Sequence, residues 1–376
     1  MKIDVLVAEI GSTTTVVNAF DRIDSGAPVF LGQGQAPTSV LEGDVRVGLQ
    51  GAVEDLRRKL GAEEISYRSM LATSSAAGGL RMTVHGLVYD MTVKAAREAA
   101  LGAGANLHLA TAGILQEEDL EDIRDIHPNL ILLAGGTDYG ERETALENAK
   151  RIRSLDLDVP VIYAGNVQNQ TRIRRIFADA KAECYITENV YPRLDELNIE
   201  PTRRIIHQVF EKHIIHAPGM SGVRDMVDGS IMPTPGAVME CAKLLYQEIG
   251  DVVVLDVGGA TTDVHSVTEG SEEVSSIQIA PEPVAKRTVE GDLGVYVNAR
   301  NLANQIGMEK LRKETGVDVE EVFSHYKPIP DTPEQFKLTE QLAWYAASMA
   351  LERHCGRYRY TYGANGRTTH ADGKDL

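Results

Sequence analysis

The stretch VLDVGGATTDV, residues 254–264, joins a strand of branched aliphatic side chains to a Gly-Gly turn and a second strand. A bound phosphate requires backbone N–H groups that face it and no side chain in the way, and glycine allows both. Gly258 and Gly259 meet this requirement, and the hydroxyl groups of Thr261 and Thr262 can donate to phosphate oxygens. We therefore interpret this stretch as a strand–turn–strand hairpin that binds the phosphates of a nucleotide.

Two carboxylates flank the same turn. Asp256 ends the first strand and Asp263 lies in the second. A carboxylate cannot contact a phosphate directly, because like charges repel, but it can hold Mg²⁺ or orient an attacking water. Asp256 is the first candidate for this role and Asp263 the second.

A second loop of the same plan lies near the N-terminus. Glu9, Gly11, Ser12, Thr13 and Thr14 again place an acid, a glycine and a cluster of hydroxyls between two strands. Either loop alone could be an ordinary hairpin turn, because short motifs match by chance. Two loops of one plan, far apart in the sequence, favour a nucleotide site with Glu9 as a further catalytic or metal-binding candidate.

The composition is that of a globular protein. The 376 residues are 43% hydrophobic and 25% charged, with a formal net charge of −17. Such an acidic chain is a poor candidate for nucleic-acid binding, which requires a basic surface. No apolar run approaches the ~18–20 residues of a membrane helix. We expect no nucleic-acid or membrane partner.

The cysteines and the N-terminus indicate a cytoplasmic location. Cys184, Cys241 and Cys355 are far apart and odd in number, which argues against a disulfide framework or a zinc cluster. The first residues lack the basic start, the long apolar stretch and the cleavage site of a signal peptide. We expect reduced thiols in the cytoplasm.

The apolar pattern divides the chain into three blocks and a tail. The first block has strands and one helix, which ends at Gly61, a natural helix stop. The second alternates strands with helices, which predicts a parallel sheet with right-handed crossovers. The third begins with a helix that leads into the phosphate hairpin. The expected strands are 3–8, 15–20, 28–33, 129–134, 159–164, 183–187, 251–256 and 262–267, and the expected helices 44–60, 141–155, 168–178, 203–215, 236–249, 295–306 and 334–352.

These blocks predict four segments. Residues 1–68 form a first lobe, 69–230 an inserted α/β domain, 231–352 a second lobe, and 353–376 a flexible polar tail. The insertion is larger than a bare lobe requires, which suggests a domain for partner contact.

The pair of loops resembles the phosphate-1 and phosphate-2 loops of the actin, sugar kinase and heat-shock chaperone ATPase superfamily. The resemblance implies an α/β fold of two ribonuclease-H-like lobes, with ATP and Mg²⁺ in the cleft between them. The helix 236–249 lies where that superfamily places its first connecting helix.

Within this superfamily the chain resembles the glutamate mutase accessory proteins called MutL. The resemblance implies an ATP-dependent chaperone or reactivating factor for an adenosylcobalamin-dependent mutase, with slow ATP hydrolysis, and it is compatible with a homo-oligomer. The segments that carry it, besides the hairpin, are AEIGSTTT (8–15), ATSSAAGGL (72–80), LLAGGTD (132–138), VIYAGN (161–166), PTPGAV (233–238) and TVEGDLG (288–294).

Besides the large insertion, the chain departs from the superfamily pattern in two places. Glu9 stands where the superfamily usually has Asp, which makes its role less secure than that of Asp256. No strand followed by Gly-Gly, which would cradle adenosine, comes after the second loop. We favour a chain shortened before that subdomain. Gly135 and Gly136, with Asp138, either turn a strand into a helix or bind a ligand at the carboxyl end of the inserted sheet.

Two other functions use the same residues. A small-molecule kinase would need a carboxylate base near the γ-phosphate, and no such residue stands out. A non-catalytic subunit would keep the fold without nucleotide. A plain loop is a simpler interpretation of Ser74 and Ser75, with Gly78 and Gly79, than a contact with phosphate or with a partner. Glu240 and Asp292 could assist Mg²⁺ or water, but acids in such positions are more often exposed to solvent without a catalytic role.

Overall fold

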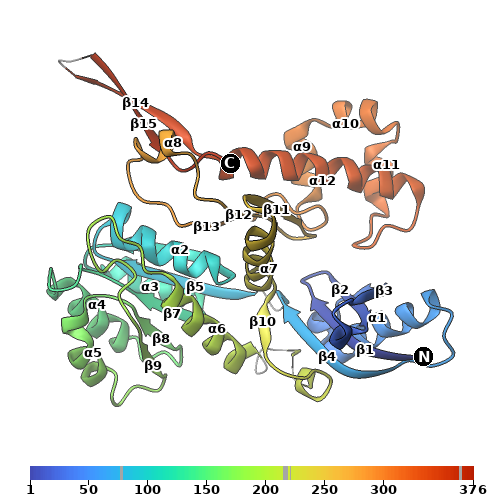
Figure 1. Ribbon diagram of the computed structural model, residues 1–376, viewed down its shortest axis with the longest axis horizontal. Coiled ribbons are helices and arrows are strands. Elements are labelled where there is room, and N and C mark those ends of the chain that lie inside the picture. The colour runs from blue at the N-terminus through green and yellow to red at the C-terminus, as the bar shows by residue number, and fades with distance from the viewer. Residues whose placement is uncertain (77–78, 215–218, 221, 364–365) are drawn as a thin grey trace.

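A computed structural model describes residues 1–76, 79–214, 219–220, 222–363 and 366–376. The chain is an α/β protein with two five-stranded sheets, a three-stranded sheet and a two-stranded arm in this part. Figure 1 shows four strands of the first sheet in blue and its fifth, β10, in yellow, with the inserted domain in cyan and green. The second lobe is orange and red, with helix α7 (Thr234–Ile249) between it and the blue sheet.

The first sheet has the strand order β10-β4-β1-β2-β3. Strands β1, β2 and β3 form an antiparallel meander, and β4 and β10 run parallel to β1. Alternate residues of the central strand are buried, because that face packs into the core. The strands are β1 (Lys2–Ile10), β2 (Thr14–Asp21), β3 (Val29–Pro37), β4 (Ser66–Ser74) and β10 (Ile231–Pro233).

Helix α1 (Val45–Lys59) covers the meander, in agreement with the predicted helix 44–60. The carboxylate of Asp44 caps it by accepting the N–H of Arg46, and the chain turns at Gly61 with φ of +63°. A Cβ atom at Gly34 of β3 would lie 2.1 Å from the carbonyl oxygen of Ala52. Glycine is required there because the helix crosses the strand so closely.

The strand pairing moves two of the predicted domain boundaries. The predicted first lobe stops at residue 68, but β4 continues to Ser74 and pairs with β1 along its length. Likewise β10, predicted to open the second lobe, is the fifth strand of the first sheet. Parallel neighbours need a long crossover, and the inserted domain forms the crossover between β4 and β10.

The inserted domain contains a five-stranded parallel sheet in the order β6-β5-β7-β8-β9. The predicted parallel sheet is confirmed, although its first two strands escaped prediction. Helices α2 and α6 contribute to the hydrophobic cluster shared with the first sheet, and α3, α4 and α5 to a second cluster. The strands are β5 (Leu80–Gly86), β6 (Ala105–Ala112), β7 (Leu130–Leu133), β8 (Val161–Tyr163) and β9 (Cys184–Ile186). The helices are α2 (Lys94–Gly102), which continues the π-helical turn Tyr89–Val93, α3 (Glu117–Ile126), α4 (Glu143–Ser154), α5 (Gln170–Ile176) and α6 (Glu200–Ile214).

The second lobe is built on an antiparallel meander in the order β11-β12-β13. Side chains of α9 to α12 form one hydrophobic cluster with Val264 of this sheet, and α7 packs with Val267 in another. The elements are β11 (Val252–Val257), β12 (Thr262–Val267), α8 (Glu272–Ser275), β13 (Ala285–Glu290), α9 (Ala299–Ile306), α10 (Met308–Thr315), α11 (Val319–Ser324) and α12 (Pro333–His354). Short 3₁₀ turns occur at Ile23–Ser25, Val40–Glu42, Val167–Asn169 and Val223–Asp225.

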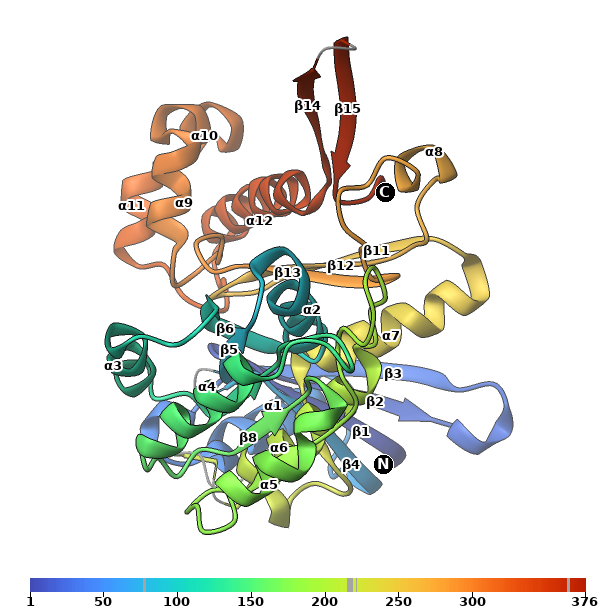
Figure 2. The ribbon, with the colours of Figure 1, turned by 90° about the vertical axis from the view of Figure 1, so that its left-hand side faces the viewer.

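The predicted flexible tail is wrong for most of its length. Strands β14 (Arg357–Gly363) and β15 (Gly366–Asp372) pair as an antiparallel arm that extends from the body in both views (Figures 1 and 2). The alternating Arg-Tyr-Arg-Tyr-Thr-Tyr sequence is a strand signal of period two. After the arm, Lys374 is buried and donates to the carbonyl oxygens of Thr268 and Pro283.

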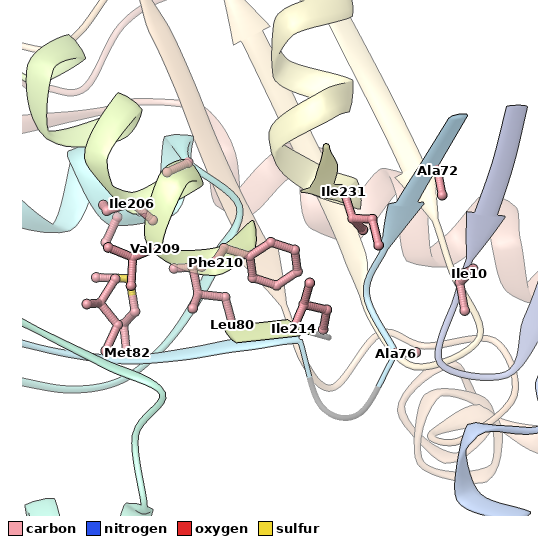
Figure 3. Close-up of a cluster of buried hydrophobic side chains, with 14 of the residues drawn as sticks. Ile10, Ala72, Ala76, Leu80, Met82, Ile206, Val209, Phe210, Ile214 and Ile231 are labelled. Atoms are coloured by element: carbon pink, nitrogen blue, oxygen red, sulfur yellow. The ribbon is translucent and has the colours of Figure 1, made fainter. Parts of the chain in front are cut away.

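One hydrophobic core joins the first sheet to the inserted domain. Figure 3 shows Ile10 and Ile231 of the first sheet in the same cluster as Met82 of β5 and Phe210 of α6. The inserted domain is therefore packed onto the first sheet. Among the described residues, no helix is both long and apolar enough to cross a bilayer.

Candidate functional site

A cleft of about 620 Å³ lies where the first sheet, the inserted domain and the second lobe meet. Both predicted loops line it, although they are far apart in the sequence. The predicted site residues on its wall are Glu9, Gly11, Ser12, Thr13, Thr14, Asp256, Gly258, Gly259, Thr261 and Asp263. The remaining one, Thr262, is buried and its hydroxyl donates to the carbonyl oxygen of Leu293 at 2.8 Å. Its predicted hydroxyl contact with phosphate is therefore wrong, because that group is used within the lobe.

The turn of the second hairpin presents free backbone N–H groups. The N–H of Gly258 closes the turn onto the carbonyl oxygen of Thr261 at 2.8 Å, so the predicted contact of this N–H with phosphate is wrong. The carbonyl oxygens of Gly258, Gly259 and Ala260 accept hydrogen bonds from residues 295–298. Within the described chain no acceptor takes the N–H groups of Gly259 and Ala260. The loop is thus held through its carbonyl groups and keeps donors available for an anion.

The turn of the first hairpin is closed in the same way. The N–H of Gly11 donates to the carbonyl oxygen of Thr14 at 3.0 Å. The hydroxyl of Ser12 donates to the carbonyl oxygen of Ser75, which follows β4. No described residue accepts the N–H groups of Ser12 and Thr13. Both turns therefore combine fixed geometry with unused donors.

The two turns touch each other. A Cβ atom built on Gly259 would lie 2.5 Å from Oγ1 of Thr13, so any side chain here would have to displace that of Thr13. Similarly, a Cβ atom on Gly294 would lie 2.3 Å from the carbonyl carbon of Ala260. The contact of Gly259 with Thr13 thus brings the two turns together, and the contact of Gly294 with Ala260 packs the second turn against its own lobe.

Two carboxylates in the cleft have unusual pKa values. Burial raises the pKa of Glu9 to about 7, against the hydrogen bond from the Thr234 hydroxyl, and the negative charge of Asp256 adds to the rise. Burial and the charge of Asp263 raise the pKa of Asp256, although Arg287 opposes this. The two carboxylates repel each other, and a cation between them would remove that repulsion.

This donor set fits Mg²⁺ bound together with phosphate. Among the described residues, no group of three or more His, Cys, Asp or Glu side chains could hold a metal ion. Mg²⁺ is commonly held by only one or two carboxylates plus substrate phosphates and water. Glu9 and Asp256 supply that number.

Asp263 has a different environment. Its Oδ1 atom accepts from Nε of Arg287 at 2.7 Å and lies 2.5 Å from Nη2, and both side chains are buried. Nη1 of Arg287 donates to the carbonyl oxygens of Leu101 and Ala105, in the turn between α2 and β6. Thr261 donates to the other oxygen of Asp263 at 3.2 Å. Asp263 therefore connects the phosphate loop to the inserted domain.

Sequence reasoning missed several residues of this cleft. Arg287 has no local motif, and its only signal is a charge within a strand of the second lobe. Thr234 lies in the PTPGAV segment that was noted for another reason. Gly104 and Asn106 bring the inserted domain to the wall of the cleft without a sequence signal.

Some of the lesser candidates line the cleft in the structure and others lie away from it. Ser74, Ser75 and Gly79 line the cleft, whereas Gly78 lies outside the described residues. Glu240 pairs with Lys243 and Asp292 with Arg353, and neither acid is among the lining residues.

Gly135, Gly136 and Asp138 are also outside the cleft, at the carboxyl end of β7. A Cβ atom on Gly136, whose φ is +70°, would lie 2.1 Å from the carbonyl oxygen of Glu141. These glycines form the tight turn from strand to helix, which was the plainer of the two predictions.

The sequence matches the protein family described as "MutL protein" over residues 5–376. It is 39% identical over 386 aligned positions to Protein MutL of Clostridium tetanomorphum, covering 99% of this chain and 83% of that protein. Among solved structures, the nucleotide-free structure of acetone carboxylase, from work on the mechanism of ATP-dependent acetone carboxylation, is 16% identical in sequence to this chain. The superposition covers 77% of this chain and 48% of the acetone carboxylase chain, at a TM-score of 0.37.

Proposed function

Because the chain belongs to the MutL protein family, we propose that it is an ATP-dependent accessory protein for an adenosylcobalamin-dependent mutase, glutamate mutase or a related aminomutase. The observation that supports this most is the meeting of two Gly-Thr turns in one cleft, with Glu9 and Asp256 on its wall. Reactivation of the mutase would be the task, and slow ATP hydrolysis its energy source.

The strand orders support an actin-like arrangement. The meander β3-β2-β1 of the first sheet recurs as β13-β12-β11 in the second lobe. In each meander the first two strands form the hairpin with the Gly-Thr turn, and its acid lies two residues before the glycine. Helix α7 runs from the last strand of the first sheet to the first strand of the second lobe. Two ribonuclease-H-like lobes connected by a helix would place nucleotide between them.

The residues of both turns would bind the phosphates. The N–H groups of Gly259 and Ala260 and the hydroxyl of Thr261 would donate from one side. Ser12 and Thr13 would donate from the other. Asp256 and Glu9 would hold Mg²⁺, which when bound neutralises phosphate oxygens and polarises the phosphoryl group. Asp256 is also the candidate for orienting the attacking water.

The bonds of Arg287 would carry the nucleotide state to the inserted domain. A phosphate that engages Thr261 competes with its hydrogen bond to Asp263, and this changes the partner of Arg287. Arg287 in turn holds the turn between Leu101 and Ala105. Different contacts in the ATP and ADP states would then shift the position of the inserted domain, which is a population shift.

Calorimetry with ATP and Mg²⁺ tests this proposal at its base. We expect binding heat and, at 100–1,000 times Kd, roughly 2–4 kcal/mol of added stability. No heat and no change in melting temperature would instead favour a non-catalytic binding subunit. Asp256→Ala should abolish slow ATP turnover, and unchanged turnover in this variant would remove Asp256 from the mechanism.

A second assay separates an accessory protein from a small-molecule kinase. The accessory role predicts that purified mutase binds differently in ATP and in ADP. ATP consumption stimulated by a small molecule without any mutase would favour the kinase.

A further inference from the structure

Three apolar side chains are exposed together at the carboxyl edge of the inserted sheet. Tyr139 is 78% exposed, Val167 40% and Leu194 71%. They lie in the loops that follow β7, β8 and β9, which are neighbours in the sheet and parallel. The carboxyl ends of parallel strands lie at one edge, so the three loops share a surface. The inserted domain, green in Figure 2, presents its helices α4, α5 and α6 to the front of that view.

Asp138 ties these three loops together. Its backbone N–H donates to the carbonyl oxygen of Pro192, in the loop that carries Leu194. Its Oδ1 atom accepts the N–H of Val167 at 2.9 Å and the Nδ2 of Asn189 at 3.0 Å. Each bond of Asp138 therefore fixes the loop of one exposed apolar residue relative to the others.

The backbone of Tyr139 is held in an unusual conformation. Its φ is +64°, in the left-handed region that a bulky residue rarely adopts. Asn166 stabilises it, because its Oδ1 accepts the N–H of Tyr139 while its Nδ2 donates to the carbonyl oxygens of Gly140 and Glu141. Strain of this kind persists where the surroundings over-determine it and is concentrated at functional sites.

None of these residues serves the core or the cleft. A tyrosine in the core would stabilise the fold through the apolar surface that it buries. Tyr139 buries little surface and still has a strained backbone, so core packing does not explain its conformation. Rigid, exposed aromatic side chains with neighbouring aliphatic ones are typical anchors of protein interfaces. The hydrogen bonds of Asp138 and Asn166 pre-order the loops that carry these side chains, which lowers the entropy cost of association.

The charges around the surface indicate the kind of partner. The loops 134–142, 164–169 and 187–199, which end where the next helix begins, together contain five acidic residues and two arginines. One of the two arginines is already paired, Arg193 with Glu196. The rim is therefore acidic, as is the chain at −17, and it is complementary to a basic surface.

We propose that Tyr139, Val167 and Leu194 form a docking surface for a protein partner that has an apolar pocket bordered by Lys and Arg side chains. Asp138 is the positioning residue of this surface. This inference rests on the proposed function, in which the partner is the mutase. It assigns contact to the edge of the inserted sheet and nucleotide to the cleft.

The test uses the full chain and the purified subunits of glutamate mutase as the probe, with affinity measured by surface plasmon resonance. The double variant Tyr139→Ala/Leu194→Ala should raise Kd at least about 30-fold, the scale of interface hot spots. Its basal ATP turnover should equal that of the wild type. Tyr362→Ala is the matched control, because Tyr362 on the arm is 80% exposed and should leave Kd unchanged.

Variants of Asp138 test the positioning role. Asp138→Ala should weaken mutase binding with Tyr139 intact, and Asp138→Asn should restore most of it, because the amide oxygen still accepts the N–H of Val167. Higher salt should weaken binding of the wild type, and salt-independent binding would contradict the basic border of the pocket.

The outcomes separate the two proposals. If the wild type does not bind the mutase at all, the proposed function fails and takes this inference with it. If the wild type binds and the double variant binds equally well, the docking surface is wrong and the proposed function stands. Loss of binding in Tyr362→Ala alone would move the surface to the arm.

Discussion

The hairpins β1–β2 and β11–β12 share one turn but stand in different surroundings. In each, the glycine N–H closes onto the carbonyl oxygen three residues later, and an acid lies two residues before that glycine. Strand β1 is enclosed, with β2 on one side and β4 on the other. Strand β11 is an edge strand of the described sheet, and Val253 and Leu255 are exposed on it.

The acids differ as well. Glu9 lies opposite Val16, and a hydroxyl from Thr234 hydrogen-bonds it. Asp256 lies opposite Asp263, which is itself paired with a buried arginine. The acid of the first hairpin is therefore held by a neutral hydroxyl, whereas the acid of the second lies beside a buried ion pair. The turn motif determines where the backbone N–H groups point. The surroundings determine which hairpin is connected to another domain, here the second hairpin through Asp263 and Arg287.

The largest expected effect follows from removing the charge that anchors the second hairpin. Arg287→Met leaves Asp263 buried without a cation, which costs about 3–5 kcal/mol. Urea unfolding of the nucleotide-free protein measures this loss. Nothing in the first hairpin has an equivalent, since Val16 requires no partner.

Two further variants show whether charge is the cause. Arg353→Met removes a partly exposed arginine that pairs with Glu290 and Asp292, and it should cost less than about 1 kcal/mol. Adding Asp263→Asn to Arg287→Met should recover part of the stability, because the unpaired charge is gone. A cost that stays the same in the double variant would assign the loss to packing.

The next effect concerns ATP turnover and depends on the proposed function. Asp256→Asn should lower kcat about 100-fold, because it removes charge from the cation site and the orientation of water. Glu9→Gln should lower kcat less, about 10-fold. Burial raises the pKa of Glu9 to about 7, so part of the wild-type protein already carries an uncharged side chain at this position. Single-turnover hydrolysis with saturating Mg²⁺ measures both, and a larger loss in Glu9→Gln would reverse the ranking of the two hairpins.

Local signals predicted the hairpins and the parallel sheet. The Gly-Thr turns, the capped helix after Asp44 and the strand 262–267 are all encoded by neighbours in sequence, so the pattern was sufficient. The crossing of β4 and β10 into one sheet was not, because it depends on pairing across the whole insertion. Arg287 and Asn106 enter the cleft only through tertiary packing. The hydroxyl of Thr262 was misassigned because strand alternation turns it toward Leu293.

The acid of the first hairpin should also be visible in the pH dependence of stability. The pKa of Glu9 is about 7 in the folded chain and 4.5 in its ordinary range, so the folded state binds more protons between these values. Stability from this group is fully present below pH 4.5 and is lost as the pH rises through 7. Without nucleotide or divalent cations, the wild type should lose roughly 2 kcal/mol relative to Glu9→Gln between pH 5 and pH 8.

Denaturant unfolding at both pH values measures this difference. The control is Glu54→Gln, an exposed acid that pairs with Arg57. It should follow the wild type across the range. Parallel pH profiles for the wild type and Glu9→Gln would mean that burial does not hold the proton on Glu9.

The smallest effect compares the same position in the two turns. A Cβ atom on Gly11 would lie 2.6 Å from the carbonyl oxygen of Thr14, whereas one on Gly258 would lie 3.1 Å from that of Thr261. Neither glycine has a positive φ, so the backbone itself tolerates alanine. Gly11→Ala must push backbone against the enclosed strand β1 and should cost about 1–2 kcal/mol. Gly258→Ala needs only a shift of a few tenths of an ångström, and should stay within about 0.5 kcal/mol, helped by a less flexible unfolded chain. Thermal unfolding of both variants decides this. Equal costs would mean that the turns have the same freedom to adjust, and that the enclosed and the edge hairpin differ only in charge.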